Sequence, residues 1–205
     1  MKKILLINPA FKGSMHSNIK VLAIPPLNLA MIARYTPDHY EVEIVDEGVE
    51  DLDYDTKADL VGITCMTPLA PRAYELAAHF RKRGIPVVMG GIHASYMPEE
   101  ALRYVDTVVV GEAETTWPQV LEDFAQGRMQ KMYKVCEPPD IENLLPPRRD
   151  LLRGKYFVET VQTGRGCPKR GSSSEPGLGA SSRQLARNSS IASCHPVARA
   201  RATKV

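Results

Sequence analysis

One segment, residues 59–91, constrains the fold of this chain more than any other. It consists of two short apolar runs, residues 60–64 and 86–89, on either side of a helical pattern over residues 68–83. A strand that is buried on both faces reads as a continuous apolar run, and two such strands joined by a helix form a parallel βαβ unit. Ligands of open parallel sheets bind beyond the carboxyl ends of the strands. We therefore expect functional residues directly after each apolar run.

Further patterns extend this unit into a larger sheet. Strands are expected over residues 3–7, 41–46 and 106–110, and helices over residues 27–35, 98–104 and 115–124. Together they predict an α/β protein with a Rossmann-like or flavodoxin-like, doubly wound parallel sheet of about five strands. The loop at residues 10–26 is much longer than the 2–6 residues of most βα loops, so we expect it to have a functional role.

Composition divides the chain into four parts. Residues 1–135 hold the predicted sheet, and residues 136–155, with two Pro-Pro pairs and few apolar side chains, are expected to be a linker. Residues 156–170 begin with another strand pattern, over residues 157–162. Residues 171–205 are rich in Ser, Ala, Arg and Gly, lack aromatic residues, and are expected to be a disordered tail.

The charge is unevenly distributed. The chain has 26 Lys and Arg and 24 Asp and Glu; from Arg165 onward the numbers are 8 and 1, which leaves 18 and 23 in residues 1–164. This acidic body argues against a nucleic-acid-binding domain. No apolar run approaches the ~20 residues of a membrane span. Four widely spaced cysteines and the lack of a secretory signal favour a reducing cytoplasm.

Several residues follow the two apolar runs of the central unit, and each has a structural alternative to a ligand role. Thr64, Met66 and Thr67 suit a strand end that fills core space and caps the next helix, with Thr67 as an N-cap before a proline. Gly90 and Gly91 allow a ligand to approach the backbone closely, but they also suit a tight turn. The chain contains neither a GxGxxG fingerprint nor a phosphate-binding GK[ST] loop.

Titratable residues lie past other strand ends. His93 is expected to be either a ligand or base near the site, or a partly exposed loop histidine. Glu112 and Glu114 suit hydrogen bonds to a polar ligand and equally suit the N-terminus of the following helix. Cys167 follows the strand pattern of residues 157–162 in a Gly/Pro turn. Alone it would be a free thiol, because a cluster site needs several thiolates.

Five short stretches resemble the N-terminal part of cobalamin-dependent radical SAM proteins. They are residues 25–29 (PPLNL), 59–64 (DLVGIT), 87–93 (VVMGGIH), 111–114 (GEAE) and 161–168 (VQTGRGCP). By this resemblance the chain covers a Rossmann-like B12-binding domain, a linker and the first strand of a radical SAM barrel. The resemblance implies a parent enzyme that transfers methyl groups or modifies carbon skeletons with cobalamin, a [4Fe–4S] cluster and S-adenosylmethionine.

The resemblance also implies a site, with the corrinoid on the carboxyl edge of the sheet and its nucleotide tail between strands. Thr64 and Met66 match positions that contact the tail, and Gly90 and Gly91 match positions where the tail passes close to the backbone. The implied rim contacts are Asn8, Thr67, His93, Gly111 and Glu112. The Asp-x-His-x-x-Gly element, which supplies a lower axial histidine in the methionine-synthase type, does not follow the first strand. We therefore expect cobalamin to bind without a protein histidine on cobalt.

The iron–sulfur motif departs from the family. The family binds its cluster through Cys-x-x-x-Cys-x-x-Cys. Cys167 matches the first metal ligand, but Gly171 and Ser174 stand at the second and third positions. Residues 171–205 resemble an out-of-frame reading of a GC-rich gene, so we hypothesise that a frameshift or truncation replaced the barrel. The chain is then a cobalamin-binding remnant that lacks catalytic activity.

Two other functions stay open at this stage. One is a flavodoxin-like regulatory or protein-interaction module without a cofactor. A receiver-type phosphoacceptor is disfavoured, because the first strand ends at Asn8 and the central one at Thr64, without the acidic residues such a site needs. The other is a small-molecule enzyme that uses Glu112 and His93 as acid and base.

Overall fold

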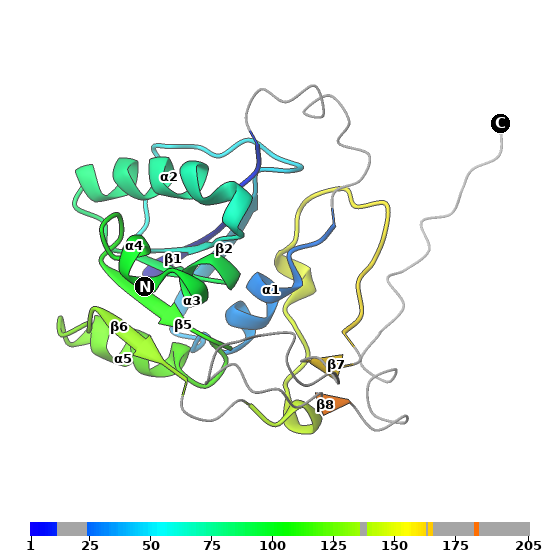
Figure 1. Cartoon of the computed structure of the whole chain (residues 1–205). Coiled ribbons are helices and arrows are strands. Elements are labelled where there is room, and N and C mark those ends of the chain that lie inside the picture. Colours follow the sequence, from blue (N-terminus) through cyan, green and yellow to red (C-terminus); the bar gives the residue numbers. More distant parts are fainter. Residues whose placement is uncertain (12–23, 136–138, 163, 166–182, 185–205) are drawn as a thin grey trace, which may run out of the picture. The chain divides into compact units, whose positions relative to one another are not determined.

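The computed structural model describes residues 1–11, 24–135, 139–162, 164–165 and 183–184. Within them, six parallel strands form one sheet in the order β2-β1-β3-β4-β5-β6 (Figure 1). The strands are β1 (Lys2–Asn8), β2 (Tyr40–Asp46), β3 (Leu60–Thr64), β4 (Val87–Gly90), β5 (Thr107–Val110) and β6 (Met132–Lys134). The strand order reverses at β1, as in a doubly wound sheet. The predicted fold class is therefore confirmed.

Five α-helices and three 3₁₀ turns occur in the described residues. The helices are α1 (Leu27–Arg34), α2 (Ala70–Lys82), α3 (Ile92–Tyr96), α4 (Pro98–Ala101) and α5 (Trp117–Ala125), and the turns are η3 (Thr67–Leu69), η4 (Ile141–Asn143) and η5 (Arg149–Leu151). Of the helices described, none has the length and apolar character needed to cross a bilayer.

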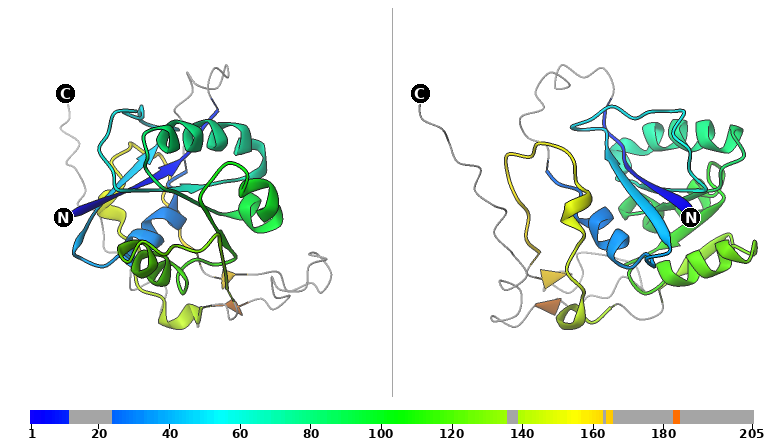
Figure 2. Two further views of the ribbon diagram at one scale, coloured as in Figure 1. Left: turned by 90° about the vertical axis from the view of Figure 1, so that its left-hand side faces the viewer. Right: turned by 180° about the vertical axis from the view of Figure 1, so that it is seen from behind.

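Alternate side chains of β1 build the two layers of the core. Leu5 and Ile7 pack in a cluster with Phe80 of α2 and with residues of α3 and α4. Ile4 and Leu6 pack in a second cluster, with residues of α1 and α5. Successive side chains of a strand point to opposite faces, so helices cover both faces of the sheet (Figures 1 and 2). Strands buried in this way explain the continuous apolar runs in the sequence.

Two short elements, one strand and one helix, were not expected from the sequence. The sixth strand, β6, has only three residues, and its buried Tyr133 pairs with Val109 of β5. Helix α3 begins directly after Gly91, where a loop was expected. Both elements are too short to produce a recognisable period, so neighbouring parts of the fold must determine their structure.

Residues 145–160, which we call the strap, belong to the same compact unit as residues 1–139. The Arg148 amide donates to the Ala30 carbonyl of α1 at 2.9 Å. Leu151 and Leu152 pack against the core cluster of α1 and α5, and Arg153 forms an ion pair with Glu43 of β2 at 3.0 Å. Most of the expected linker is thus packed on the domain. The boundaries of the four predicted parts themselves stay predictions.

The prediction of a strand over residues 157–162 is wrong, because the structure describes all six residues and none is in a strand. Residues 140–144 and 161–205 form a second unit, in which β7 (Gly164–Arg165) and β8 (Arg183–Gln184) pair antiparallel. The expected disorder of residues 171–205 falls outside the described residues, apart from β8.

Candidate functional site

The register of β3 and β4 places Thr64 directly opposite Gly90 at the carboxyl edge of the sheet. Because side chains alternate along a strand, these two residues share the face of Leu60 and Val88. Leu60 and Val88 pack with α1 and α5. Thr64 and Gly90 therefore face the α1–α5 layer, at the edge where doubly wound folds bind ligands.

The two adjacent glycines have different structural roles. Among the described residues, the atom nearest to a Cβ on Gly90 would be the Val109 carbonyl oxygen, at 4.0 Å, so these residues leave the space beside Gly90 open. Gly91 has a φ of 94°, and a Cβ there would lie 2.8 Å from the Cys65 carbonyl oxygen and 3.0 Å from Thr64 Oγ1. Gly91 thus lets the loop after β4 pack against the loop after β3, whereas Gly90 leaves room for a ligand.

The Thr64 hydroxyl is held from α1, on the layer that it faces, by a residue that the sequence did not single out. Asn28, in the first turn of α1, donates from Nδ2 to Thr64 Oγ1 at 2.7 Å. The hydroxyl that accepts this bond keeps its own proton for a further acceptor. The only sequence signal for Asn28 was its place in the stretch of residues 25–29.

Ser95 of α3 links the turns after β4 and β5. Its hydroxyl donates to the Gly91 carbonyl at 2.9 Å and accepts from the Gly111 amide at 2.9 Å. Gly111 has a φ of 92°, so it also adopts a conformation that favours glycine. The predicted residues Gly91 and Gly111 therefore belong to one hydrogen-bonded arrangement. No sequence pattern pointed to Ser95.

Met66 and Thr67 lie in the loop after β3. Met66 is an exposed apolar side chain at the carboxyl edge. It occupies the N-cap position of η3, which has no side-chain cap hydrogen bond, and Thr67 is the first residue of that turn. The prediction that Thr67 is an N-cap is therefore wrong. Both side chains are exposed and accessible to a ligand.

His93 lies in α3 and is only 3% exposed, so the alternative of a partly exposed loop histidine is wrong. Its Nε2 lies 2.7 Å from the Tyr74 hydroxyl, which donates to Glu100 Oε1 at 3.2 Å. Burial and the Glu100 carboxylate raise the pKa of Tyr74. Nδ1 of His93 has no hydrogen-bond partner among the described residues. Its imidazole is thus enclosed beside α2 and α4.

Asn8 ends β1 and donates from its side-chain amide to Asp46 Oδ1 at 2.9 Å. Asp46 is 2% exposed, and its Oδ2 accepts from the Tyr156 hydroxyl of the strap at 3.0 Å. Burial and the Asp46 charge raise the pKa of Tyr156. The strap therefore reaches the end of β2, next to a predicted rim residue.

A buried ion pair connects the loops after β1 and β2 with α2. Glu47 accepts from Arg72 Nε at 3.0 Å and from the Ala10 amide at 3.3 Å. Although burial lowers the pKa of Arg72, hydrogen bonds to Glu47, Tyr54 and Glu75 outweigh this effect and raise it. This network stabilises the carboxyl edge through bonds that stay within the protein.

Other predicted residues are placed with less detail. Glu112 follows Gly111 and is half-buried, and Glu114 is buried. Cys167, the predicted metal ligand, lies outside the described residues. Among the residues that are described, no group of three or more His, Cys, Asp or Glu side chains is arranged to hold a metal ion.

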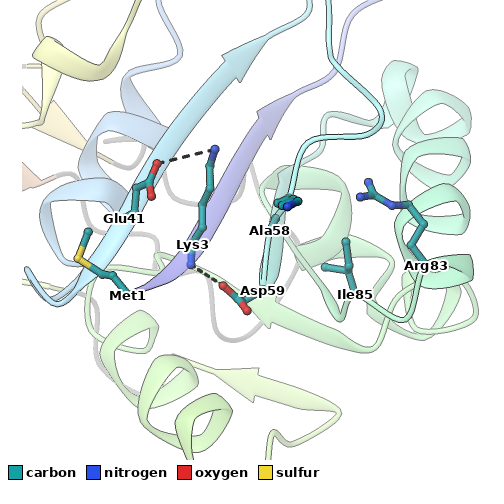
Figure 3. Close-up of a pocket in the computed structure, with 8 residues that line it drawn as sticks. Met1, Lys3, Glu41, Ala58, Asp59, Arg83 and Ile85 are labelled. Carbon is teal, nitrogen blue, oxygen red and sulfur yellow. Dashed lines mark hydrogen bonds and ion pairs between the residues drawn. The ribbon is translucent and has the colours of Figure 1, made fainter.

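An open hollow of about 440 Å³ lies at the amino edge of the sheet, away from these residues (Figure 3). The Lys3 amide donates to Asp59 there at 2.6 Å, and Lys3 Nζ is paired with Glu43 at 2.7 Å. Arg83 donates to backbone carbonyls of residues 54–56. Three charged residues of the hollow, Lys3, Asp59 and Arg83, are thus already paired within the protein, and we do not assign the hollow a ligand.

The reversed strand order defines a class of protein: a doubly wound α/β domain, the kind of fold that binds ligands at the carboxyl edge of its sheet. Residues 21–121 match the family model described as the B12 binding domain. This part of the chain belongs to the B12-binding domain family, as the resemblance implied.

The curated relatives that the chain resembles are methyltransferases by name. Over 150 residues the chain is 39% identical to bacteriochlorophyllide d C-8(2)-methyltransferase of Chlorobaculum tepidum, covering 68% of this chain and 33% of that protein. Bacteriochlorophyllide d C-12(1)-methyltransferase of the same organism is 30% identical, with coverages of 71% and 32%. An uncharacterized methyltransferase of Pyrococcus horikoshii is 32% identical, with coverages of 81% and 43%. The chain therefore spans about a third of the length of the first two relatives.

Proposed function

We propose that the chain holds cobalamin at the carboxyl edge, with the nucleotide tail beside Thr64 and Gly90. The open space at Gly90, opposite the Thr64 hydroxyl, is the observation that carries this proposal. This open space fits a narrow polar tail better than a bulky group, because the loops after β3 and β4 already touch at Gly91. The Thr64 hydroxyl accepts from Asn28 and donates to no acceptor among the described residues, so it can donate to an acceptor on the tail.

The remaining predicted contacts form the rim of the proposed site. Exposed Met66 is proposed to contact the tail together with Thr64, and the rim contacts are proposed to be Asn8, Thr67, Gly111 and Glu112. The backbone of His93 lies at this edge, where its amide donates to the Cys65 carbonyl at 3.0 Å, while its imidazole is enclosed. The burial of that imidazole supports binding without His93 on cobalt. It also argues against the alternative in which His93 acts as an exposed base.

We further propose that this domain comes from a cobalamin-dependent radical SAM methyltransferase. The methyltransferase names of the relatives support this proposal. Bound cobalamin would supply a cobalt atom that carries a methyl group. The chain itself is proposed to lack the methyl-transfer activity and to bind neither S-adenosylmethionine nor [4Fe–4S], because Cys167 has Gly171 and Ser174 in place of the other two cysteines. A cytoplasmic location stays a prediction.

Incubation of the full chain with hydroxocobalamin, followed by desalting and a visible spectrum, tests this function. The wild-type chain is expected to keep corrinoid absorbance near one equivalent. Gly90→Val fills the open space and should remove most of this retention, with an unchanged circular dichroism spectrum. Ala58→Val, at the amino-edge hollow, is the matched control and should retain the corrinoid. No retention by the wild-type chain would instead favour a flavodoxin-like module without a cofactor.

A further inference from the structure

The hydroxyl of Ser95 connects two loops that no backbone hydrogen bond in the described residues joins. It donates to Gly91, four residues earlier in the chain, and accepts from Gly111, sixteen residues later. The first bond is common for a serine in a helix. The second is not local, because it joins α3 to the end of a neighbouring strand. Only a group that donates and accepts at the same time makes both bonds.

The two glycines that Ser95 joins follow adjacent strands of the sheet. Gly91 comes after β4 and Gly111 after β5, and both have positive φ values, of 94° and 92°. Helix α3 has only five residues, so it is too short to hold its position by itself. The Ser95 hydroxyl therefore bridges the two turns directly.

We propose that Ser95 is a positioning residue for the corrinoid site. Its hydroxyl holds the turns at Gly91 and Gly111 at the separation that the ligand requires, and Ser95 need not touch the ligand. This proposal rests on the proposed function, because the ligand is cobalamin. Gly90, whose side is open, directly precedes the first of the two turns along the chain, so Ser95 acts on the site through its neighbour Gly91.

Three variants of the full chain test this role by hydroxocobalamin titration. Ser95→Ala removes both hydrogen bonds and should raise the Kd for hydroxocobalamin about tenfold, as expected for two ordinary hydrogen bonds. Ser95→Thr keeps a hydroxyl and should restore the Kd to within about twofold of wild type.

Thr107→Val is the matched control, because it removes a hydroxyl that donates to the Gln130 carbonyl at 2.8 Å at the opposite end of β5. It should lower the unfolding midpoint about as much as Ser95→Ala but leave the Kd unchanged. An unchanged Kd in Ser95→Ala overturns the proposal, and so does a Kd that Ser95→Thr fails to restore.

Amide hydrogen exchange of Gly111 gives a readout that does not depend on cobalamin. Its amide should exchange about tenfold faster in Ser95→Ala than in the wild type and in Ser95→Thr, while the amide of Val109 keeps its rate. Equal Gly111 rates in all three proteins overturn the role of Ser95 even if the wild-type chain binds no corrinoid. Failure of corrinoid binding with altered exchange would overturn the proposed function and the ligand role of Ser95, but not the connection between the turns.

Discussion

Gly91 is the residue whose backbone conformation most restricts substitution at the carboxyl edge. Gly91→Ala places a Cβ 2.8 Å from the Cys65 carbonyl oxygen at a positive φ. Because Cys65 is buried, we expect the free energy of unfolding to fall by about 2–4 kcal/mol. Urea denaturation measures this change.

Gly84 provides the control for Gly91. It has a φ of 75°, but a Cβ there would have no atom of the described residues within 4 Å. Gly84→Ala should therefore lower the free energy of unfolding by only about 1 kcal/mol, which is the effect of the backbone conformation alone. Equal losses in both variants would show that the contact with Cys65 contributes nothing.

The Cys65 thiol makes stability depend on alkaline pH. Burial, with a smaller contribution from the Glu100 charge, raises the pKa of Cys65 from 9.0 to about 12. Between these values the unfolded chain loses a proton that the folded chain keeps, so the free energy of unfolding should fall as the pH rises from 9 to 12. For Cys65→Ala, the free energy of unfolding measured by urea denaturation should fall less steeply over this pH range. Parallel pH profiles for the two proteins would contradict this expectation.

The residues of the site were predictable to different degrees. Thr64 and Gly90 were predictable, because they end apolar runs, and parallel strands bring their carboxyl ends to one edge. Asn28 and Ser95 were not, because each forms its decisive hydrogen bond with a residue distant in the sequence. The enclosed position of His93 depends on Tyr74, on another helix, so its neighbours in the sequence did not reveal it.

At the scale of elements, long apolar patterns were easier to predict than short or irregular segments. Helix α2 and strand β3 have buried stripes or runs of a recognisable period. The strap does not show a pattern of this kind. It packs through two half-buried leucines and several specific hydrogen bonds. Its Pro-Pro pairs therefore indicated a linker, although much of it packs against the domain.

The hydroxyl of Tyr156 is expected to fasten the strap to β2. Tyr156→Phe leaves Oδ2 of the buried Asp46 without this donor, so the free energy of unfolding should fall by about 1–3 kcal/mol. Tyr96→Phe, at a half-exposed position of α3, is the control and should stay within about 0.5 kcal/mol of wild type. Chemical denaturation of the three proteins makes the comparison, and identical midpoints would count against a stabilising role of this contact.

At the scale of the whole molecule, the strap determines where the chain can be shortened. A chain that ends at residue 162 keeps the strap and should unfold at the same urea concentration as the full chain. A chain that ends at residue 139 loses the packing of Leu151 and Leu152 and the ion pair of Arg153. It should be less stable by about 3 kcal/mol or more. Equal stability of the two shortened chains would show that the strap is dispensable.

The position of the strap in the chain has a consequence for synthesis. All six strands of the sheet lie before residue 135, but the segment that pairs with Glu43 and Asp46 of β2 extends to residue 160. At translation rates of 5–20 residues per second, these 25 residues follow after roughly one to five seconds. During that interval the edge strand β2 lacks these contacts. Until the ribosome has released the strap, the edge strand β2 of a nascent chain is therefore most exposed to pairing with a wrong strand.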